Sequence, residues 1–325
     1  MCIRDSTLAG AFEAAGFDLA VVGGPVRDAL IGRPTHDLDF TTNAMPDDIL
    51  RIVKPISTAQ WDIGRAFGTI GARVQGEQVE VTTYRADSYD GVTRKPTVEF
   101  GDTIEADLHR RDFTVNAMAL LVPAVKLVDP TGGVEDLIAG VLRTPASPHV
   151  SFGDDPLRML RAARFSAQLG FRIDDDTFDA ITQLRATLEI VSPERIQSEL
   201  VRLMQTDDPV RGIRVLVETG LIEEFLPEVS ALRLEVDEHH HHKDVYEHSL
   251  TVLNQAISLE QSRNPGAEPD VALRIAALLH DIGKPRTRKL EDGGVVTFHH
   301  HDVVGARMAR KRLQALRFDT DTTEA

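Results

Sequence analysis

The sequence predicts an α+β fold, with a mixed sheet and helices over residues 1–145 followed by an all-α remainder. Short apolar or alternating runs at 19–22, 37–42 and 79–84, rich in β-branched residues, are typical of strands. From about residue 155 onward, apolar residues recur at helical spacing, as in PLRMLRAARFSAQLGF. These patterns indicate a sheet-containing N-terminal part and a helical C-terminal part.

Signals at the ends of segments support this division. Pro25 suits the first position of a short helix, and Gly32 suits the position just beyond its end. Gly170 predicts the end of the helix that follows residue 155, and Ser192 with Pro193 predicts the start of another. Three later segments are also expected to be helical: 248–260, 272–280 and 305–316.

Two segments in the N-terminal part are less regular. Residues 115–122 fit either a strand or a helix, and residues 125–130 fit a strand that runs into a turn. The polar end, LQALRFDTDTTEA, predicts that the chain is truncated at its C-terminus.

Composition limits the class of protein. The chain has 325 residues, enough for two or three domains, and 42% of them are hydrophobic, as in ordinary globular proteins. A formal net charge of −15 argues against simple coating of nucleic acid but permits an enzyme with a local basic cleft. Cys2 is the single cysteine, which excludes an internal disulfide. No apolar run approaches a membrane span and no signal peptide is evident, so we expect a cytoplasmic protein without a membrane partner.

The run VVGGPVRDALIGRPTHDLDF combines two kinds of site. Gly23 and Gly24 form a turn before a helix, with Arg27 close behind, and such a turn can receive phosphate. Asp37 and Asp39 are two residues apart on one strand, so both carboxylates leave the same face, about 7 Å apart, and can share divalent cations. Taken singly, these features also fit a tight turn and a solvated strand end.

A third carboxylate is available on a later strand. Glu80 lies in the predicted strand 79–84 and is a candidate third catalytic acid beside Asp37 and Asp39. An exposed charge at a sheet edge is an equally plausible interpretation.

Six motifs in order carry a family resemblance. They are GGPVRD with DLD, RRDFTVNA (110–117), DPTGGVEDL (129–137), DDPLRMLRAARF (154–165) and SPERIQSEL (192–200). The series resembles the bacterial tRNA nucleotidyltransferase and poly(A) polymerase family, which are class II members of the DNA polymerase beta superfamily. The resemblance implies a nucleotidyltransferase head over 1–145, a helical neck and body over 146–226, and an HD domain over 227–325.

The resemblance implies roles for the head residues. Asp37 and Asp39 would hold two Mg²⁺ ions, one activating the RNA 3′-hydroxyl and one holding the triphosphate. Gly24 and Arg27 match triphosphate contacts of the family, and Arg111 matches a further nucleotide contact. Two more members of the RRD motif match helpers at the sugar or the domain hinge: Asp112 and Asn116. The implied reaction adds CCA to the 3′ end of tRNA from CTP and ATP.

The neck motif implies a choice of base. Asp155 and Arg158 match the family's pair that reads the incoming nucleotide, since an acceptor and a donor can imitate a Watson–Crick edge. Arg161 and Arg164 follow on one side of the same helix and match further nucleotide contacts. Asp155 also fits the N-cap of that helix, and Arg164 also fits a structural salt bridge. Residue Asp154 stands where the family usually has Glu.

Residues 85–100 are rich in glycine, proline and mixed charge, and they resemble a flexible loop of the family. Such a loop is a candidate for coupling the change from CTP to ATP to the length of the product.

A second series resembles the HD phosphohydrolase domain. His248, His280 and Asp281 would be metal ligands, together with one of His299, His300 and His301, of which His301 fits best. This donor set suits a second divalent metal such as Mn, Ni or Fe. The usual last aspartate of the domain is absent up to Ala325. The tract His239–His242 is also explained by a solvated loop.

Several functions stay open on sequence alone. The main alternative to CCA addition is a bacterial poly(A) polymerase, whose members tend to be more basic. A CC-only or A-only enzyme, an HD-type metal-dependent phosphohydrolase acting on RNA ends, and a silent tRNA-binding module are also compatible with parts of the pattern. The oligomeric state cannot be predicted.

Overall fold

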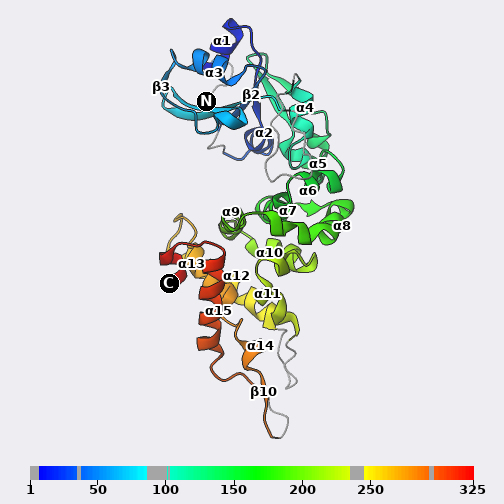
Figure 1. The fold of residues 1–325 in the computed structure, drawn as a ribbon, viewed down its shortest axis with the longest axis vertical. Helices are drawn as coiled ribbons and strands as arrows, with labels where there is room; N and C mark the ends of the chain where they lie inside the picture. Colours follow the sequence, from blue (N-terminus) through cyan, green and yellow to red (C-terminus); the bar gives the residue numbers. More distant parts are fainter. Residues whose placement is uncertain (1–6, 35–37, 86–100, 102, 235–244, 293–295) are drawn as a thin grey trace. The chain divides into compact units, whose positions relative to one another are not determined.

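The computed structural model describes residues 7–34, 38–85, 101, 103–234, 245–292 and 296–325. The chain forms two compact units, Met1–Asp154 and Asp155–Ala325, and each is described by itself (Figure 1). The first unit combines a mixed sheet with helices, and the second is predominantly helical. The predicted α+β fold class is therefore confirmed.

Strands β1 to β7 of the first unit form one seven-stranded sheet in the order β3-β4-β5-β2-β1-β6-β7. Strands β2 and β5 are parallel neighbours, and the other neighbouring pairs are antiparallel. Register partners on neighbouring strands point their side chains to one face of a sheet. The strands are β1 (Leu19–Val22), β2 (Leu38–Thr42), β3 (Ser57–Trp61), β4 (Thr69–Val74), β5 (Glu77–Thr83), β6 (Ala119–Val122) and β7 (Lys126–Val128).

The strand predictions for the first unit are confirmed. Residues 19–22 form β1, β2 lies within 37–42, β5 overlaps 79–84, and β7 lies within 125–130. The ambiguous segment 115–122 divides into a 3₁₀ turn, η3 (Thr114–Asn116), and strand β6. The strand starts only at Ala119 because from there the backbone pairs with β1, where Ala119 is the partner of Val22.

Short helices flank this sheet. They are α1 (Thr7–Ala14), α2 (Gly24–Leu30), α3 (Pro46–Val53), η2 (Arg65–Phe67), α4 (Ile104–His109), α5 (Gly133–Ala139) and α6 (Pro148–Asp154), and a two-residue strand β8 spans Val141–Leu142. Helix α2 starts at Gly24, so Pro25 occupies its second position, and Gly32 follows the helix end with φ of 70°. Both positions agree with the asymmetry of proline and glycine at helix ends.

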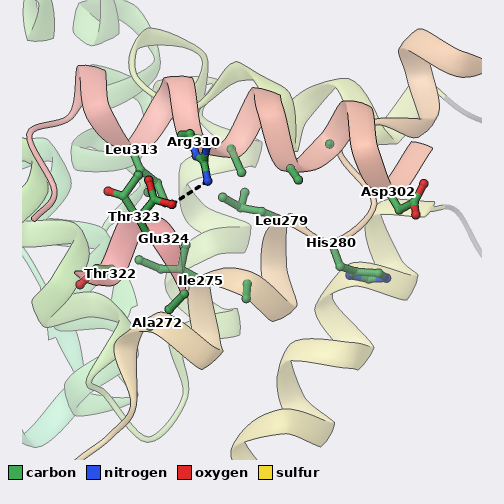
Figure 2. A pocket seen from close by; sticks show the side chains of 15 residues that line it. Ala272, Ile275, Leu279, His280, Asp302, Arg310, Leu313, Thr322, Thr323 and Glu324 are labelled. Carbon is green, nitrogen blue, oxygen red and sulfur yellow. Dashed lines mark hydrogen bonds and ion pairs between the residues drawn. The ribbon is translucent and has the colours of Figure 1, made fainter. Parts of the chain in front are cut away.

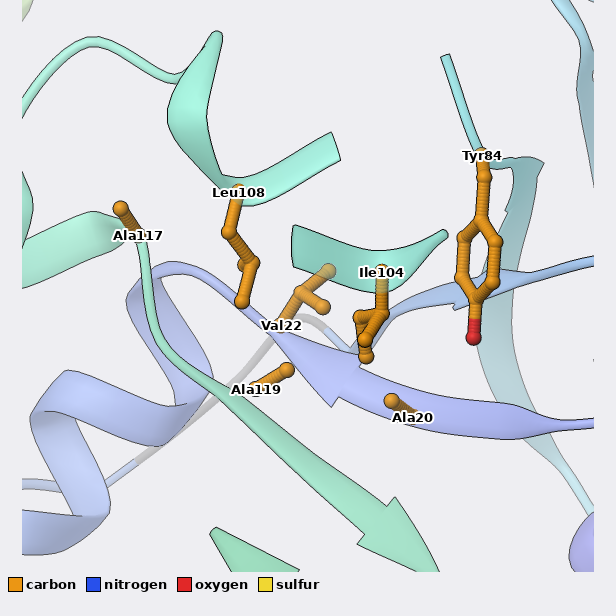
Figure 3. Packing of buried hydrophobic residues seen from close by; sticks show 7 residues of the cluster. All are labelled: Ala20, Val22, Tyr84, Ile104, Leu108, Ala117 and Ala119. Atoms are coloured by element: carbon orange, nitrogen blue, oxygen red, sulfur yellow. The ribbon is translucent and has the colours of Figure 1, made fainter. Parts of the chain in front are cut away.

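A compact apolar cluster lies where β1 and β6 meet helix α4 (Figure 3). Ile104 and Leu108 are four residues apart on α4 and pack with Val22 and Tyr84, together with Ala20, Ala117 and Ala119. Thr103 caps the helix by accepting the N–H of Ala106 at 3.3 Å. This packing fixes the rotation of α4 about its axis. It therefore also fixes the direction of the polar side chains between Ile104 and Leu108 and just after them.

The second unit is built from helices of 3 to 19 residues. They are α7 (Leu157–Leu169), α8 (Asp175–Leu184), η4 (Arg185–Ile190), α9 (Pro193–Met204), α10 (Pro209–Glu218), η5 (Leu221–Glu224), α11 (Pro227–Ala231), η6 (Leu232–Leu234), α12 (Val245–Arg263), α13 (Val271–Leu279), α14 (Lys284–Thr287), α15 (His301–Ala315) and α16 (Thr320–Glu324). Gly170 ends α7 in the left-handed conformation, and Ser192 caps α9, as the sequence predicts.

Short strands interrupt the helical part, which the sequence pattern does not predict. They are β9 (Arg172–Ile173) and an antiparallel pair, β10 (Lys289–Leu290) with β11 (Val296–Thr297). Two-residue strands are too short to give a period in the sequence, which explains why they are missed. Among the described residues, no helix is long and apolar enough to cross a membrane.

Candidate active site

Two arginine side chains, Arg27 and Arg111, lie close to the backbone of the Gly23–Gly24 turn between β1 and α2. Gly23 has φ of 73° and ψ of −133°, a conformation that residues with a side chain rarely adopt. A Cβ atom added to Gly23 would lie 3.3 Å from Arg111 Nη1, and one added to Gly24 would lie 3.6 Å from Arg27 Nη2. Helix α2 has only seven residues, so its dipole contributes little, and the arginines supply most of the positive charge at this turn. The arrangement suits a phosphate group.

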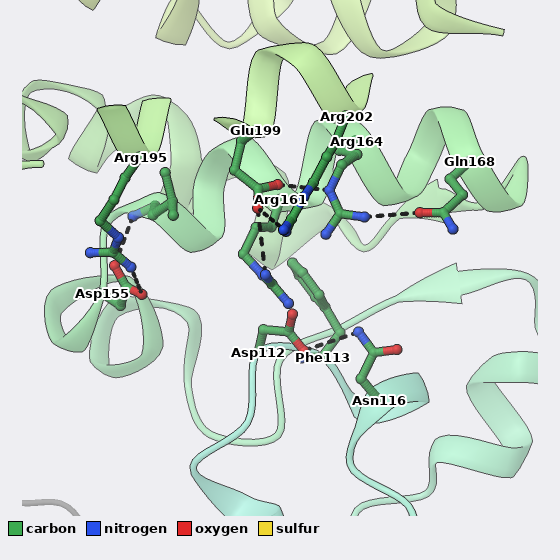
Figure 4. A network of polar contacts seen from close by, with 11 residues as sticks. Asp112, Phe113, Asn116, Asp155, Arg161, Arg164, Gln168, Arg195, Glu199 and Arg202 are labelled. Carbon is green, nitrogen blue, oxygen red and sulfur yellow. Dashed lines mark hydrogen bonds and ion pairs between the residues drawn. The ribbon is translucent and has the colours of Figure 1, made fainter. Parts of the chain in front are cut away.

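Arg27 is almost fully buried, and hydrogen bonds orient its guanidinium. Nη1 donates to Asn116 Oδ1 at 2.5 Å, and Nε donates to Asp28 Oδ1 at 2.8 Å. Asn116 Nδ2 in turn donates to Asp112 Oδ1 at 3.0 Å, and the same oxygen accepts the backbone N–H of Phe113 at 2.8 Å (Figure 4). Asp112 and Asn116 therefore lie in the network that holds Arg27.

Arg111 is oriented by a buried carboxylate. Its Nη2 donates to Asp107 Oδ2 at 2.9 Å, and Arg110 Nη2 lies 3.2 Å from Asp107 Oδ1. Burial by itself would raise the pKa of Asp107, but the charges of Arg111 and Arg110 outweigh it and lower the pKa below its usual value. Asp107 is thus ionised, and the arginines of the RRD motif form a partly buried ion cluster rather than a surface pair.

The register of the sheet brings Asp39 and Glu80 together. They are partners on the parallel pair β2–β5, and both side chains are exposed, whereas Val79 and Val81 on either side of Glu80 are buried. Neighbouring strands are about 4.8 Å apart, so the two carboxylates can share a cation. Oxygen donors of this kind fit Mg²⁺. Asp37 lies outside the described residues.

Trp61 and Gly71 continue this row of residues across two further strands. Glu80 is the partner of Gly71 on β4, and Gly71 is the partner of Trp61 on β3. A Cβ atom on Gly71 would collide with the indole of Trp61, so the indole lies on the face that carries Glu80. Only the glycine at position 71 leaves room for this ring.

The second unit contains the expected base-reading residues. Asp155 Oδ1 accepts the backbone N–H of Leu157 at 3.2 Å, and Asp155 Oδ2 is paired with Arg195 Nη2 at 2.8 Å. The first contact is the capping alternative that the sequence raises, although helix α7 begins only after Pro156. Each oxygen of Asp155 thus has one partner and retains a second lone pair that can accept a further hydrogen bond.

Arg164 and Arg161 meet at Glu199 on α9. Arg164 Nε donates to Glu199 Oε2 at 2.7 Å, Arg161 Nη1 lies 3.6 Å from Oε1, and Arg202 Nη1 lies 3.4 Å from Oε1 (Figure 4). The Arg164 guanidinium also lies 4.0 Å from the centre of the Phe165 ring. Glu199 is 4% exposed. These contacts support the structural salt-bridge interpretation of Arg164. They are compatible with an additional contact to a nucleotide.

Sequence reasoning missed Asp107 and Glu199, although each leaves a trace in the sequence. Asp107 precedes Arg110 and Arg111 by three and four residues, the spacing at which opposite charges meet on a helix. Glu199 lies among Ile196, Leu200 and Leu203, on the apolar face of an amphipathic helix. An acid on such a face is nearly always paired.

A cluster of histidines surrounds Asp281 in the C-terminal part. His280 Nε2 and His248 Nε2 lie 3.1 and 3.7 Å from Asp281 Oδ2, and His301 Nε2 lies 3.6 Å from Oδ1. Candidate ligand atoms of His248, His280 and Asp281 are all within 4.8 Å of one another. His299 and His300 are exposed, and the tract 239–242 lies outside the described residues.

The orientation of two imidazoles fits a metal. Nδ1 of His280 lies 2.9 Å from the carbonyl oxygen of Ala277, and Nδ1 of His301 lies 2.8 Å from that of Phe298. A carbonyl can only accept, so each Nδ1 carries the proton and each Nε2 faces Asp281 as a potential ligand. Imidazole and carboxylate together suit first-row divalent metals.

A lysine competes for the same carboxylate. Lys284 Nζ lies 2.8 Å from Asp281 Oδ2. Burial by itself would raise the pKa of Asp281, but hydrogen bonds from His280 and Lys284 overcome this and lower the pKa to about 2. A metal at this cluster would therefore have to displace Lys284 from Asp281, and it would also have to replace the proton by which His280 Nε2 donates to that carboxylate.

A cavity of about 370 Å³ lies among α13, α15 and α16 (Figure 2). His280 and Asp302 stand at one end of it, and most of the remaining wall is apolar, including Ile275, Leu279 and Leu313. Its lining gives no further cluster of ligand atoms beside the Asp281 cluster within the described residues.

Three family models match successive parts of the chain. The Poly A polymerase head domain matches residues 19–143, the probable RNA and SrmB-binding site of polymerase A matches residues 170–232, and the HD domain matches residues 245–324. The first covers the sheet with the Gly23–Gly24 turn and the carboxylates of Asp39 and Glu80, and the last covers the histidine cluster around Asp281.

Known proteins and structures agree with these matches. The CCA-adding enzyme of Enterococcus faecalis (strain ATCC 700802 / V583) is 39% identical over 208 residues, which are 64% of this chain and 50% of that protein. The chain thus spans about half the length of several curated relatives it matches. The CCA-adding enzyme of Geobacillus stearothermophilus is 35% identical over 282 residues, which are 83% of this chain and 68% of that protein.

Solved structures are similar over nearly the whole chain. The structure of the Bacillus stearothermophilus CCA-adding enzyme in complex with CTP aligns with a TM-score of 0.65 and 27% identity, covering 98% of this chain and 66% of that one. A tRNA-processing enzyme in apo form I has a TM-score of 0.72 at 21% identity, covering 99% and 75%, which shows the common fold. The chain belongs to the family of CCA-adding enzymes, within the tRNA nucleotidyltransferase and poly(A) polymerase group.

Proposed function

We propose that this protein adds CCA to the 3′ end of tRNA without a nucleic-acid template, using CTP and ATP by two-metal nucleotidyl transfer. One arrangement in the head of this family member carries the proposal. Arg27 and Arg111 lie at the Gly23–Gly24 turn, and Asp39 lies beside Glu80 in the same sheet. Phosphate charge and divalent metal ions would meet on these residues. A cytoplasmic location is part of this proposal.

Each group has a role in this scheme. Asp37, Asp39 and Glu80 would hold Mg²⁺, which supplies Lewis-acid stabilisation of the reacting phosphate and activates the RNA 3′-hydroxyl. Arg27 and Arg111 would bind the triphosphate, with Gly23 and Gly24 allowing its close approach. Asp112 and Asn116 keep Arg27 in place. Positioning and charge stabilisation account for most of catalysis in this class of reaction.

The second unit would select the nucleotide. Asp155 accepts hydrogen bonds and Arg158 donates them, which matches the exocyclic amino group and ring nitrogen that cytosine and adenine share. UTP and GTP would leave these groups unpaired, which is costly in a binding site. Arg161 and Arg164 would add contacts from the same helix. We also propose three domains: a head over residues 1–145, a neck and body over 146–226, and an HD domain over 227–325.

The direct test is incorporation. Purified protein is incubated with Mg²⁺, tRNA lacking its terminal CCA, and each labelled NTP in turn. Addition of two C residues and one A supports the proposal. A long A tract would instead assign a poly(A) polymerase, and no incorporation by protein that also fails to bind CTP would overturn the proposal.

A second activity is supported by the cluster around Asp281. We infer that His248, His280, Asp281 and His301 hold a divalent ion such as Mn²⁺, Ni²⁺ or Fe²⁺ and serve a phosphohydrolase that acts on RNA ends. The observation is the Nε2 atoms of His280 and His301 directed at one carboxylate. Hydrolysis of an RNA 2′,3′-cyclic phosphate to a terminal phosphomonoester, lost in Asp281→Ala but kept in Asp39→Ala, would support it. Equal loss in both variants would contradict it.

A further inference from the structure

Asp107 has no role in the chemistry described so far, yet it is fully buried and pairs with Arg111, which reaches the Gly23–Gly24 turn. Its two oxygens have separate partners. Oδ2 accepts Arg111 Nη2 at 2.9 Å, while Oδ1 accepts the backbone N–H of Arg85 at 3.2 Å and Arg110 Nε at 3.3 Å. One carboxylate thus links Arg85, two residues beyond strand β5, to both arginines of the RRD motif.

The contact with Asp107 determines the direction of the Arg111 guanidinium. With Nη2 on Asp107, Nη1 comes within 3.3 Å of the position a Cβ on Gly23 would take. Arg111 Nε is buried and has no hydrogen-bond partner among the described residues. Nη2 is therefore anchored on Asp107, and Nη1 is the donor directed toward the turn.

The anchor itself is rigid. Asp107 lies between Ile104 and Leu108 of α4, which pack into the apolar cluster with Val22 and Tyr84. A carboxylate on a helix locked by core packing holds its partner in one geometry, whereas a surface carboxylate would not. The Arg111 side chain therefore loses its conformational entropy on folding, and binding a ligand does not have to order it again.

We propose that Asp107 is a positioning residue for the triphosphate of the incoming ribonucleotide, acting by holding Arg111 against the Gly23–Gly24 turn. This inference rests on the proposed function, because it assigns the anion at the turn to the nucleotide. Asp107 does not touch the nucleotide in this scheme.

The charge of Asp107 makes the test decisive. If Asp107 acted on phosphate only through its field, its neutralisation would strengthen the binding of an anion. If it acts by positioning, Asp107→Asn releases Arg111 and weakens binding. The two explanations predict changes of opposite sign.

The experiment is a double-mutant cycle measured by calorimetric titration of the full chain with Mg²⁺–CTP. Asp107→Asn and Arg111→Ala should each weaken CTP binding about tenfold, which is about 1.4 kcal/mol, and the double variant should lose no more than either single one. Inorganic tripolyphosphate should show the same losses, because the contact is with phosphate. Asp136→Asn is the matched control, since Asp136 is also buried but accepts from Thr114 at 2.7 Å.

Unchanged or tighter binding by Asp107→Asn would overturn the inference, and so would additive losses in the double variant. Should Asp107→Asn fail to fold, Arg111→Lys decides: positioning predicts weaker CTP binding, and a pure charge effect predicts wild-type affinity. A wild-type chain that binds neither CTP nor tripolyphosphate would refute the proposed function itself, which is a distinct outcome.

Discussion

Asp39 and Glu80 are register partners on the parallel strands β2 and β5, although 41 positions separate them in the chain. Both are exposed on the same face, with the glycine at position 71 and the indole of Trp61 continuing the row. The pair offers two carboxylates that a divalent cation could share, as the proposed function requires.

Removal of either carboxylate should abolish nucleotide transfer. We expect Asp39→Asn and Glu80→Gln each to lower the rate of CMP incorporation by at least about a hundredfold, because metal ligation supplies several kcal/mol of charge stabilisation. The Mg²⁺ concentration for half-maximal rate should also rise. Glu77→Gln, at the exposed start of the same strand, should have the wild-type rate. Wild-type kinetics for Glu80→Gln would exclude it as a metal ligand.

Asp155 should govern the choice of base. Asp155→Asn replaces a pure acceptor with a group that also donates, so we expect discrimination against UTP and GTP to fall about tenfold or more. The ratio of kcat/KM for CTP and UTP measures this change. Arg195→Ala removes the partner at Asp155 Oδ2 and should keep the ratio. A similar fall in both variants would point to loss of local structure instead.

Glu199 should be important for stability. Glu199→Ala leaves Arg164, which is 8% exposed, without its partner at 2.7 Å, and breaking a buried ion pair in this way costs about 3–5 kcal/mol. Arg202→Ala should cost no more than about 1 kcal/mol, since the Arg202 side chain is 57% exposed. Midpoints of urea unfolding compare the two, and equal midpoints would contradict the prediction.

Gly71 should be required for the position of Trp61. A methyl group at position 71 would overlap the indole, so Gly71→Ala should destabilise the first unit by about 1–3 kcal/mol and shift the emission of the single tryptophan to longer wavelength. Gly10→Ala is the matched control, because nothing lies within 4 Å of its Cβ and alanine favours the helix. Unchanged emission in Gly71→Ala would refute the packing.

The Asp281 cluster should bind a transition metal in competition with Lys284. We expect Asp281→Asn to abolish Mn²⁺ binding in a calorimetric titration and Lys284→Met to strengthen it, because the ammonium occupies Asp281 Oδ2. His299→Ala should bind as the wild type does. Replacing His239–His242 with alanine removes adventitious Mn²⁺ binding to that tract and leaves the Asp281 cluster to be measured alone. Wild-type Mn²⁺ affinity in Asp281→Asn would disprove the assignment.

Much of the fold follows from local rules that operate within a few residues. The strand at 19–22, the positive φ of Gly32 and Gly170, and the cap at Ser192 each depend on a residue and its immediate neighbours. The division of 115–122 did not follow from local rules, since its strand begins where β1 offers a partner. The pairs β10 and β11 were missed because two-residue strands carry no period.

The sequence by itself determined which chemical groups are present and in what order: a glycine turn, arginines, spaced aspartates and a histidine-aspartate dyad. Only the tertiary structure decided which of them meet. Glu80 joins Asp39 through sheet register, Arg111 reaches Gly23 through the locked helix α4, and Arg164 meets Glu199 across α7 and α9. Contacts between distant segments depend on register and packing. A shift of one residue would move a strand side chain to the opposite face of the sheet and would turn a helical side chain by about 100°.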